Sequence, residues 1–548
     1  MSDNIAGLLQ AHLATPERVL YRQHIDGAWR DFGAGDIAAL AARWQQAFRR
    51  EGFAAGDRIA ICLRNGINWV AIDQAALGMR LVIVPLYVDD NAANMAWCTQ
   101  HSGARLLLLE NERMLQALRE DGTPLPPTVV VGAADGGFLP AATDGFAVEA
   151  CDAGTLATIC YTSGTSGRPK GVMLSHDNIL ANVQAIIALY IARAEDSFLS
   201  FLPLSHMFER TPGYYLPLAV GAKVPYARSV LQLAEDLASQ QPSIIFAVPR
   251  VFEKFHIRIH EALAASALKR ALFERVVTAG WRAHRGVAGP FDRLLLALLL
   301  KRVAGPILAR LGGRLRLAVI GGAPLEAHIA RTFIGLGLCV LHGYGMTEAA
   351  PVIAVNRPDN NDPASVGPPL PGTELRLGGG GELLARSASV MTGYWNNAEA
   401  SARSVDADGW LHTGDLAELK DGRVYIRGRL KDVLVLSNGE KLPPQDVELA
   451  ILSDEVFEQG MLVGEGRPFL AFITVSKQGD EKLLVRRAND RLKSFPRYIR
   501  VRRVIIATET WSVDNGLMTP TMKVKRSEVL ARFAREIEAV YAAAKEPA

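Results

Sequence analysis

Short apolar runs alternate along the first 320 residues with longer segments whose apolar positions recur at helical spacing. The runs predict strands at 58–63, 81–86, 106–109, 156–161, 197–202, 223–226, 243–248 and 316–320. The segments between them predict helices at 36–51, 68–77, 91–101, 178–189 and 231–240, after Thr211, and over 251–310. Strands that alternate with helices in this way predict a mostly parallel sheet covered by helices.

The pattern changes after Gly378, where the runs shorten and glycines become frequent. Turn-forming pairs such as Asp408-Gly409 predict a small β-rich subdomain at about 365–430. Residues from Lys431 onward mix both periodicities. We therefore expect an α/β fold with a large N-terminal domain, 1–430, of helix-covered and mostly parallel sheets, followed by a small α+β domain, 431–548. A Gly-, Ala- and Asp-rich segment, 131–154, is predicted to be a linker.

The length and composition narrow the functional classes. A chain of 548 residues exceeds one ordinary core and indicates several domains or subdomains. A net charge of +3 does not indicate nucleic-acid binding, which needs a stronger basic bias. The five cysteines have no metal-ligand spacing, and their scatter suits a reducing compartment. Residues 1–20 lack a basic region followed by an apolar one, so we expect no secretory signal and a cytoplasmic location.

The most apolar run, 294–300, is far shorter than the roughly 20 residues that a bilayer crossing needs. It fits either a buried helix or a helix lying in a membrane interface. Basic residues near the run add weight to the second alternative: Lys269, Arg270, Arg275, Arg282, Arg285 and Arg293. Peripheral contact with the inner face of a membrane therefore stays open.

A glycine- and hydroxyl-rich stretch at 161–170 reads Tyr-Thr-Ser-Gly-Thr-Ser-Gly-Arg-Pro-Lys. It follows a predicted strand and precedes a predicted helix, an arrangement that suits phosphate binding, and Lys170 adds a cation. It is not a Walker A loop, because Lys170 is followed by Gly171 rather than by Ser or Thr. The stretch is either a flexible surface turn or a phosphate-binding loop.

Five further stretches carry residues suited to chemistry, at 202–210, 321–325, 342–348, 412–432 and 517–526. Tyr344, between two glycines, suits base stacking, and Glu348 near phosphates suits Mg²⁺. Asp415 suits a ribose diol. His206 alone is more often structural, and the lysines at 523 and 525 alone would be an ordinary basic surface.

In this order and spacing, the stretches resemble the motifs of the adenylate-forming superfamily, also called AMP-binding or acyl-activating enzymes, over about 21–526. The run Leu-Pro-Leu-Ser-His-Met-Phe-Glu-Arg at 202–210 and Gly-Tyr-Gly-Met-Thr-Glu at 343–348 look most like the long-chain fatty-acid–CoA ligase branch. The resemblance implies two steps. A fatty acid carboxylate attacks the α-phosphate of ATP to give acyl-AMP and pyrophosphate, and coenzyme A then takes the acyl group and releases AMP.

The resemblance also implies roles for individual residues. Lys523 would be the catalytic lysine, acting with His206, Thr347 and Glu348, and Glu348 would hold Mg²⁺. ATP would be bound by Thr162, Ser163, Gly164, Thr165, Ser166, Gly167, Lys170, Gly322, Ala323, Tyr344, Gly345, Asp415 and Arg429. Lys431 would be the hinge of a mobile C-terminal domain. Met522 stands where many relatives have glycine, so Lys525 is the alternative to Lys523.

Other functions within and outside the family remain open. The chain could stop at acyl-AMP, or pass the acyl group to an acyl carrier protein. A non-catalytic nucleotide sensor is disfavoured, because it would not need Lys523 beside Lys170, Glu348 and Asp415. Apolar residues near the motifs are candidates for an acyl slot, although core packing explains them equally well: Phe201, Tyr214, Phe246, Val248 and Ile320.

Overall fold

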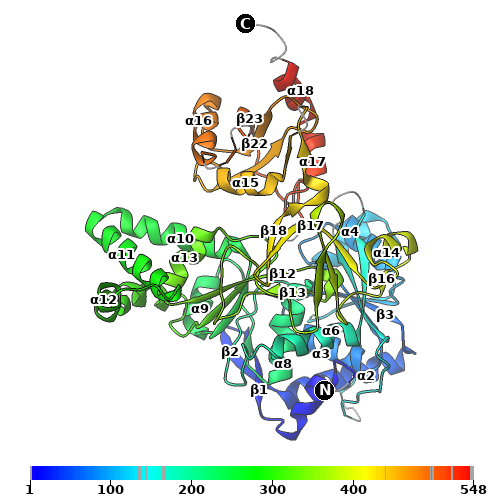
Figure 1. Ribbon diagram of the computed structural model, residues 1–548. Coiled ribbons are helices and arrows are strands. Elements are labelled where there is room, and N and C mark those ends of the chain that lie inside the picture. The colour runs from blue at the N-terminus through cyan, green and yellow to red at the C-terminus, as the bar shows by residue number, and fades with distance from the viewer. Residues whose placement is uncertain are drawn as a thin grey trace.

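The computed structural model describes residues 3–132, 137–141, 145–162, 168–437, 440–493, 495–496, 499–519 and 523–542 (Figure 1). The predicted alternation of strands and helices is confirmed in a seven-stranded sheet with the order β16-β8-β7-β4-β3-β5-β6. Its strands are β3 (Arg58–Cys62), β4 (Val82–Pro85), β5 (Leu106–Leu109), β6 (Thr128–Val130), β7 (Leu156–Thr162), β8 (Lys170–Ser175) and β16 (Gly393–Tyr394). The helices α2 (Ala34–Arg50), α3 (Ile67–Gly78), α4 (Ala92–Ser102) and α5 (Glu112–Asp121) connect the early strands. The described residues of the predicted linker contain no helix or strand.

The surroundings of the stretch 161–170 differ from the prediction. The predicted helix 178–189 is confirmed as α6 (His176–Ile187), but an unpredicted strand, β8, lies between the loop and this helix and pairs antiparallel with β7, with Thr162 opposite Lys170. Val172 and Leu174 are buried at alternating positions, which favours a strand over a helix. Helix α6 begins only after β8, where Ser175 caps it. Lys170 therefore lies at a strand end, and its neighbours Ser163–Gly167 fall outside the described residues.

A second sheet has the order β10-β11-β12-β13 and is parallel except for its last pair. Its strands are β10 (Ile244–Ala247), β11 (Leu317–Ile320), β12 (Cys339–Gly345) and β13 (Val352–Val355). The predicted strand 197–202 is wrong as a continuous strand. It forms single bridges, to Lys223, Ile244 and Tyr226, and so joins this sheet to the three-stranded sheet β2-β1-β9. The strands of that sheet are β1 (Val19–Ile25), β2 (Ala28–Gly33) and β9 (Val224–Pro225).

The long helical stretch is confirmed as three helices, α10 (Pro249–Ala264), α11 (Ala267–His284) and α12 (Pro290–Ala309). Further helices are α8 (Leu216–Val220), which follows a π-helical turn at Arg210–Tyr215, α9 (Leu233–Gln240) and α13 (Ala327–Gly335). In Figure 1, α10, α11 and α12 form a lobe at one side of the large domain.

The β-rich subdomain is an antiparallel sheet with the order β14-β15-β17-β18, made of Glu374–Leu377, Glu382–Arg386, Leu411–Lys420 and Arg423–Arg429. Beyond it, β21 (Gln459–Val463), β22 (Leu470–Val475) and β23 (Val501–Ala507) form a separate sheet with α15 (Pro444–Leu452), α16 (Glu481–Arg491), α17 (Arg526–Arg532) and α18 (Ala534–Ala542). Figure 1 shows this C-terminal part above β17 and β18. The boundary between 430 and 431 stays a prediction.

A fully buried ion pair lies in the core of the large domain. Arg210 Nη2 donates to Asp73 Oδ1 of α3 at 2.5 Å, and both side chains are inaccessible to solvent. Arg210 Nη1 also donates to Thr158 Oγ1 of β7 at 2.9 Å, and Nε donates to the Tyr215 hydroxyl at 2.8 Å. The guanidinium thus joins α3, β7 and the turn that follows His206. These contacts satisfy a charge that burial would otherwise make very costly.

We expect Arg210→Met to lower the free energy of unfolding by about 4 kcal/mol, because it leaves Asp73 buried without its cation. Denaturant unfolding measures this loss. The matched control is Arg403→Met, which breaks an exposed helical pair with Glu399 and should cost less than about 1 kcal/mol. Equal losses in the two variants would contradict the role given to Arg210.

Candidate active site

Lys523 comes from the far end of the chain and meets residues of the large domain. Its backbone is held by the Thr519 hydroxyl, which accepts from Lys523 N at 3.0 Å. Solvent still reaches the side chain, but the surrounding protein desolvates it, and this lowers its pKa. The positive charge of Arg429 lowers the pKa further, while the carboxylates of Asp415 and Glu348 act in the opposite direction. The ammonium group therefore interacts electrostatically with three of the predicted site residues.

The carboxylate of Asp415, on β17, is held by two neighbouring side chains. It faces Arg429 across the β17–β18 pair, and Arg429 Nε lies 3.3 Å from Asp415 Oδ1. The Tyr344 hydroxyl donates to Asp415 Oδ2 at 2.6 Å. Burial raises the pKa of Asp415, whereas Arg429, Tyr344 and Lys523 act to lower it. The carboxylate is thus fixed by two neighbours and close to the charge of a third.

Glu348 and Lys170 are linked by Tyr394, a residue that no sequence motif indicated. The Tyr394 hydroxyl donates to Glu348 Oε1 at 2.8 Å, and Lys170 Nζ lies over the Tyr394 ring, 4.9 Å from its centre. Tyr394 reaches this position because β16 pairs with β8, and this register places Tyr394 opposite Val172. The signal that could have found it is the aromatic-rich run Gly393-Tyr394-Trp395, but its partner strand lies more than 200 residues earlier.

Two loops bring backbone groups to the same region. Gly322 and Ala323 follow β11 and are exposed, and Gly322 adopts φ +80°, a conformation that glycine tolerates well. Gly345 ends β12, and a Cβ there would come within 2.0 Å of the Pro351 carbonyl oxygen, so a side chain does not fit. Thr347 begins the short 3-10 turn that carries Glu348. Both loops lie at the carboxyl ends of strands, where α/β sheets bind ligands.

His206 presents a defined hydrogen-bond donor. Its Nδ1 accepts from Phe208 N at 3.1 Å at the start of a helical turn, Met207–Glu209. Burial lowers the pKa of His206 to about 4, and the charge of Lys523 contributes to this shift. At neutral pH the ring is therefore uncharged, and because Nδ1 accepts, we assign the proton to Nε2. The imidazole can donate a hydrogen bond to an oxyanion without adding a full charge.

The structure thus brings together most of the predicted site residues. Lys431 lies at the edge of the group, exposed in a 3-10 turn, Leu430–Asp432, directly after Arg429. Thr162 ends β7 opposite Lys170.

Of the residues suggested for an acyl slot, Tyr214 and Ile320 are fully buried in the core, and the Tyr214 hydroxyl donates to Asp73. Among the described residues, no group of three or more His, Cys, Asp or Glu side chains could hold a metal ion.

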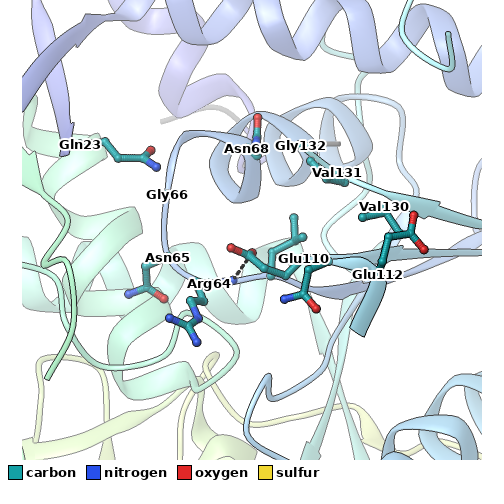
Figure 2. Close-up of a pocket in the computed structure, with 12 residues that line it drawn as sticks. Gln23, Arg64, Asn65, Gly66, Asn68, Glu110, Glu112, Val130, Val131 and Gly132 are labelled. Atoms are coloured by element: carbon teal, nitrogen blue, oxygen red, sulfur yellow. Dashed lines mark hydrogen bonds between the residues drawn. The ribbon is translucent and has the colours of Figure 1, made fainter. Parts of the chain in front are cut away.

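A cavity of about 540 Å³ is lined by residues outside the predicted site (Figure 2). It lies at the carboxyl ends of β3, β5 and β6, where the strand order changes direction between β3 and β5. Arg64, Asn65, Glu110 and Glu112 surround it, and the Asn65 side chain donates to Leu202 O at 2.6 Å. This polar lining does not suit the acyl chain that the sequence resemblance implies.

The fold and the site define an enzyme that binds an adenine nucleotide. The chain belongs to the AMP-binding enzyme family, whose model matches residues 10–395, and the model of the family's C-terminal domain matches 431–545.

Relatives and solved structures agree with this assignment. The chain is 31% identical to a long-chain-fatty-acid–CoA ligase, FadD15, of Mycobacterium bovis, over 98% of this chain and 97% of that protein. It is 26% identical to a long-chain-fatty-acid–[acyl-carrier-protein] ligase, AEE15, of Arabidopsis thaliana, over 89% and 80%. ATP-bound MatB from Rhodopseudomonas palustris shares the fold, with a TM-score of 0.75 at 20% identity over 97% and 99% of the two chains.

We expect Lys523→Met to raise the pKa of His206 from about 4, because the positive charge that disfavours the imidazolium is removed. The pKa should stay below its ordinary value, since burial remains. NMR titration of ¹³C-labelled histidine measures the shift. Lys525→Met is the matched control and should leave His206 unchanged. An unchanged His206 pKa in Lys523→Met would show that Lys523 does not reach the site in solution.

Proposed function

We propose that the protein activates a long-chain fatty acid with ATP to form acyl-AMP and pyrophosphate, and then transfers the acyl group to coenzyme A. The observation that carries the proposal is the electrostatic interaction of Lys523 with Asp415, Arg429 and Glu348. The name of the FadD15 relative, which spans nearly the same length, supports the long acyl chain and the acceptor.

The first step has an electrostatic problem, because a carboxylate must approach a polyanion. A cation between the two offsets their repulsion, which is strong in a partly desolvated site. We assign this role to Lys523, which would bridge the carboxylate and the α-phosphate. His206 Nε2 would donate to the carboxylate and hold it in line for attack. Because His206 is neutral, it orients the nucleophile without neutralising it.

The nucleotide would be held by the residues around Asp415. Tyr344 and the exposed backbone of Gly322 and Ala323 would enclose adenine, and Asp415 would accept from the ribose hydroxyls. Arg429 keeps Asp415 charged and in place. The Tyr344–Asp415 hydrogen bond ties the two contacts together, so adenine and ribose would meet a preformed surface.

The phosphates would lie near Lys170, Thr347 and Glu348. A single carboxylate fits Mg²⁺, which keeps several waters and is commonly bound by one or two carboxylates together with substrate phosphates. The ion would supply charge neutralisation at the phosphates. Tyr394 positions Glu348 for this contact and carries Lys170 on its ring. The roles of Ser163, Gly164, Thr165, Ser166 and Gly167 in binding phosphate stay predictions.

The second step needs Lys523 to leave, because the thiol must reach the same acyl carbonyl. We propose a rotation at Lys431, which lies exposed between β18 and the C-terminal part.

An acyl carrier protein is the second candidate acceptor of the acyl group, and the name of the AEE15 relative favours it. None of the helices in the described part of the chain is long and apolar enough to cross a membrane.

We expect Lys523→Ala to abolish acyl-AMP formation from fatty acid and ATP but to retain transfer from supplied acyl-AMP to coenzyme A. The lysine contributes charge only in the first step, so the two half-reactions should separate. Pyrophosphate release measures the first, and thioester formation measures the second.

Lys525→Ala is the control, since it changes the neighbouring lysine of the same segment and should keep both half-reactions. Equal loss of both half-reactions in Lys523→Ala, or normal adenylation, would refute the role of Lys523.

A further inference from the structure

Large apolar side chains are exposed together on α11, α12 and the loop between them. Five of the twelve large apolar residues exposed among the described residues lie there: Leu268 (81%), Val287 (69%), Phe291 (72%), Leu294 (58%) and Leu298 (62%). Phe291, Leu294 and Leu298 follow one another at spacings of three and four, so they share one face of α12. We call these five residues the helical patch.

The position of α12 is unusual for its composition. A helix that is apolar all round is normally buried, as α3 is, where eleven of twelve residues are buried. Helix α12 is similarly apolar through Leu294–Leu300, yet Asp292 and Ala304 are its only buried residues. It packs on the rest of the lobe through Ala304 and its neighbours Leu300 and Val303. The side that carries Phe291, Leu294 and Leu298 has no such cover.

Positive charge surrounds the helical patch. Residues 267–310 contain nine Lys and Arg against two Asp and Glu, a net charge of +7, so the rest of the chain carries −4. Arg293, Lys301 and Arg302 are exposed, and no carboxylate among the described residues pairs with them. One of the two acids, Asp292, is already paired with Arg282. The basic residues therefore remain available to an anionic surface.

We propose that the helical patch docks the protein on an anionic lipid bilayer. Apolar side chains flanked by Lys and Arg are the combination that inserts into the headgroup region and is held there by anionic lipids. A second copy of the chain is a poorer occupant, because two surfaces of +7 would repel each other. A nucleic acid is also a poorer partner, because its charged backbone would not bury the leucine and phenylalanine side chains of the helical patch.

The lobe is placed so that docking leaves the rest of the enzyme free. Figure 1 shows α10, α11 and α12 projecting at one side of the large domain, away from α16, α17 and α18. The C-terminal part could therefore rotate while the lobe stays on the bilayer. The consequence for catalysis rests on the proposed function: long-chain fatty acids partition into bilayers, so a docked enzyme would take its substrate from the lipid.

Vesicle flotation of the full chain tests the docking. The protein should float with vesicles of equal parts phosphatidylcholine and phosphatidylglycerol, much less with phosphatidylcholine alone, and less at high salt. Leu294→Gln with Leu298→Gln should weaken binding by about tenfold or more, because two apolar side chains that would be buried in the bilayer are lost while helix propensity is kept. Lys301→Gln with Arg302→Gln should weaken binding to anionic vesicles only.

Matched controls separate the patch from general effects. Leu419→Gln with Leu530→Gln removes two partly exposed leucines elsewhere, and Arg113→Gln with Arg119→Gln makes the same change in net charge on α5. Both controls should bind like the wild type. No flotation of the wild type, or patch variants that bind as it does, would overturn the proposal. The proposal would also be overturned if the wild type sedimented as a dimer and the leucine variant as a monomer.

Activity with a water-soluble medium-chain acid distinguishes this proposal from the proposed function. The leucine variant should keep that activity and lose rate only when a long-chain acid is supplied in anionic vesicles. Flotation without activity on any fatty acid would refute the function and leave the docking intact. Equal rates of wild type and variant on vesicle-bound acid would refute the supply of substrate from lipid.

Discussion

The hydrogen bonds of the buried Arg210 guanidinium are the interaction on which the part of the candidate site around His206 depends. A charge without access to water needs partners on every side, and Arg210 finds them on α3, on β7 and within its own turn. The same contacts fix the turn that carries His206 and the strand that ends at Thr162. Half of the site is therefore built into a rigid core before any substrate binds.

The other half depends on contacts that are easier to break. Asp415 and Arg429 lie on the β17–β18 hairpin, and the exposed Lys523 interacts with them electrostatically. Hydrogen bonds from Tyr344 to Asp415 and from Tyr394 to Glu348 hold these two carboxylates within the large domain, whereas Lys523 comes from the C-terminal part. This division suits the two-step reaction that we propose, in which Lys523 leaves between the steps.

Local patterns in the sequence predicted much of this structure, and long-range pairing explains what they missed. The alternation of strands and helices, the hairpins after Gly378 and the residues around Lys523 all follow from short motifs. The strand β8 was missed because its residues become a strand by pairing with β7 and β16. Tyr394 was missed because its role depends on that pairing. The exposure of α12 could not be predicted, since a buried helix and an exposed one have the same apolar sequence.

Pyrophosphate release from ATP, measured over carboxylic acids of graded length with and without coenzyme A, is the decisive test of the proposed reaction. We expect long-chain acids to release pyrophosphate. Without coenzyme A the release should stop after about one turnover, and with coenzyme A it should continue, with AMP and acyl-CoA as products. Failure of every acid to release pyrophosphate, or release of inorganic phosphate and ADP instead, would contradict the proposed reaction.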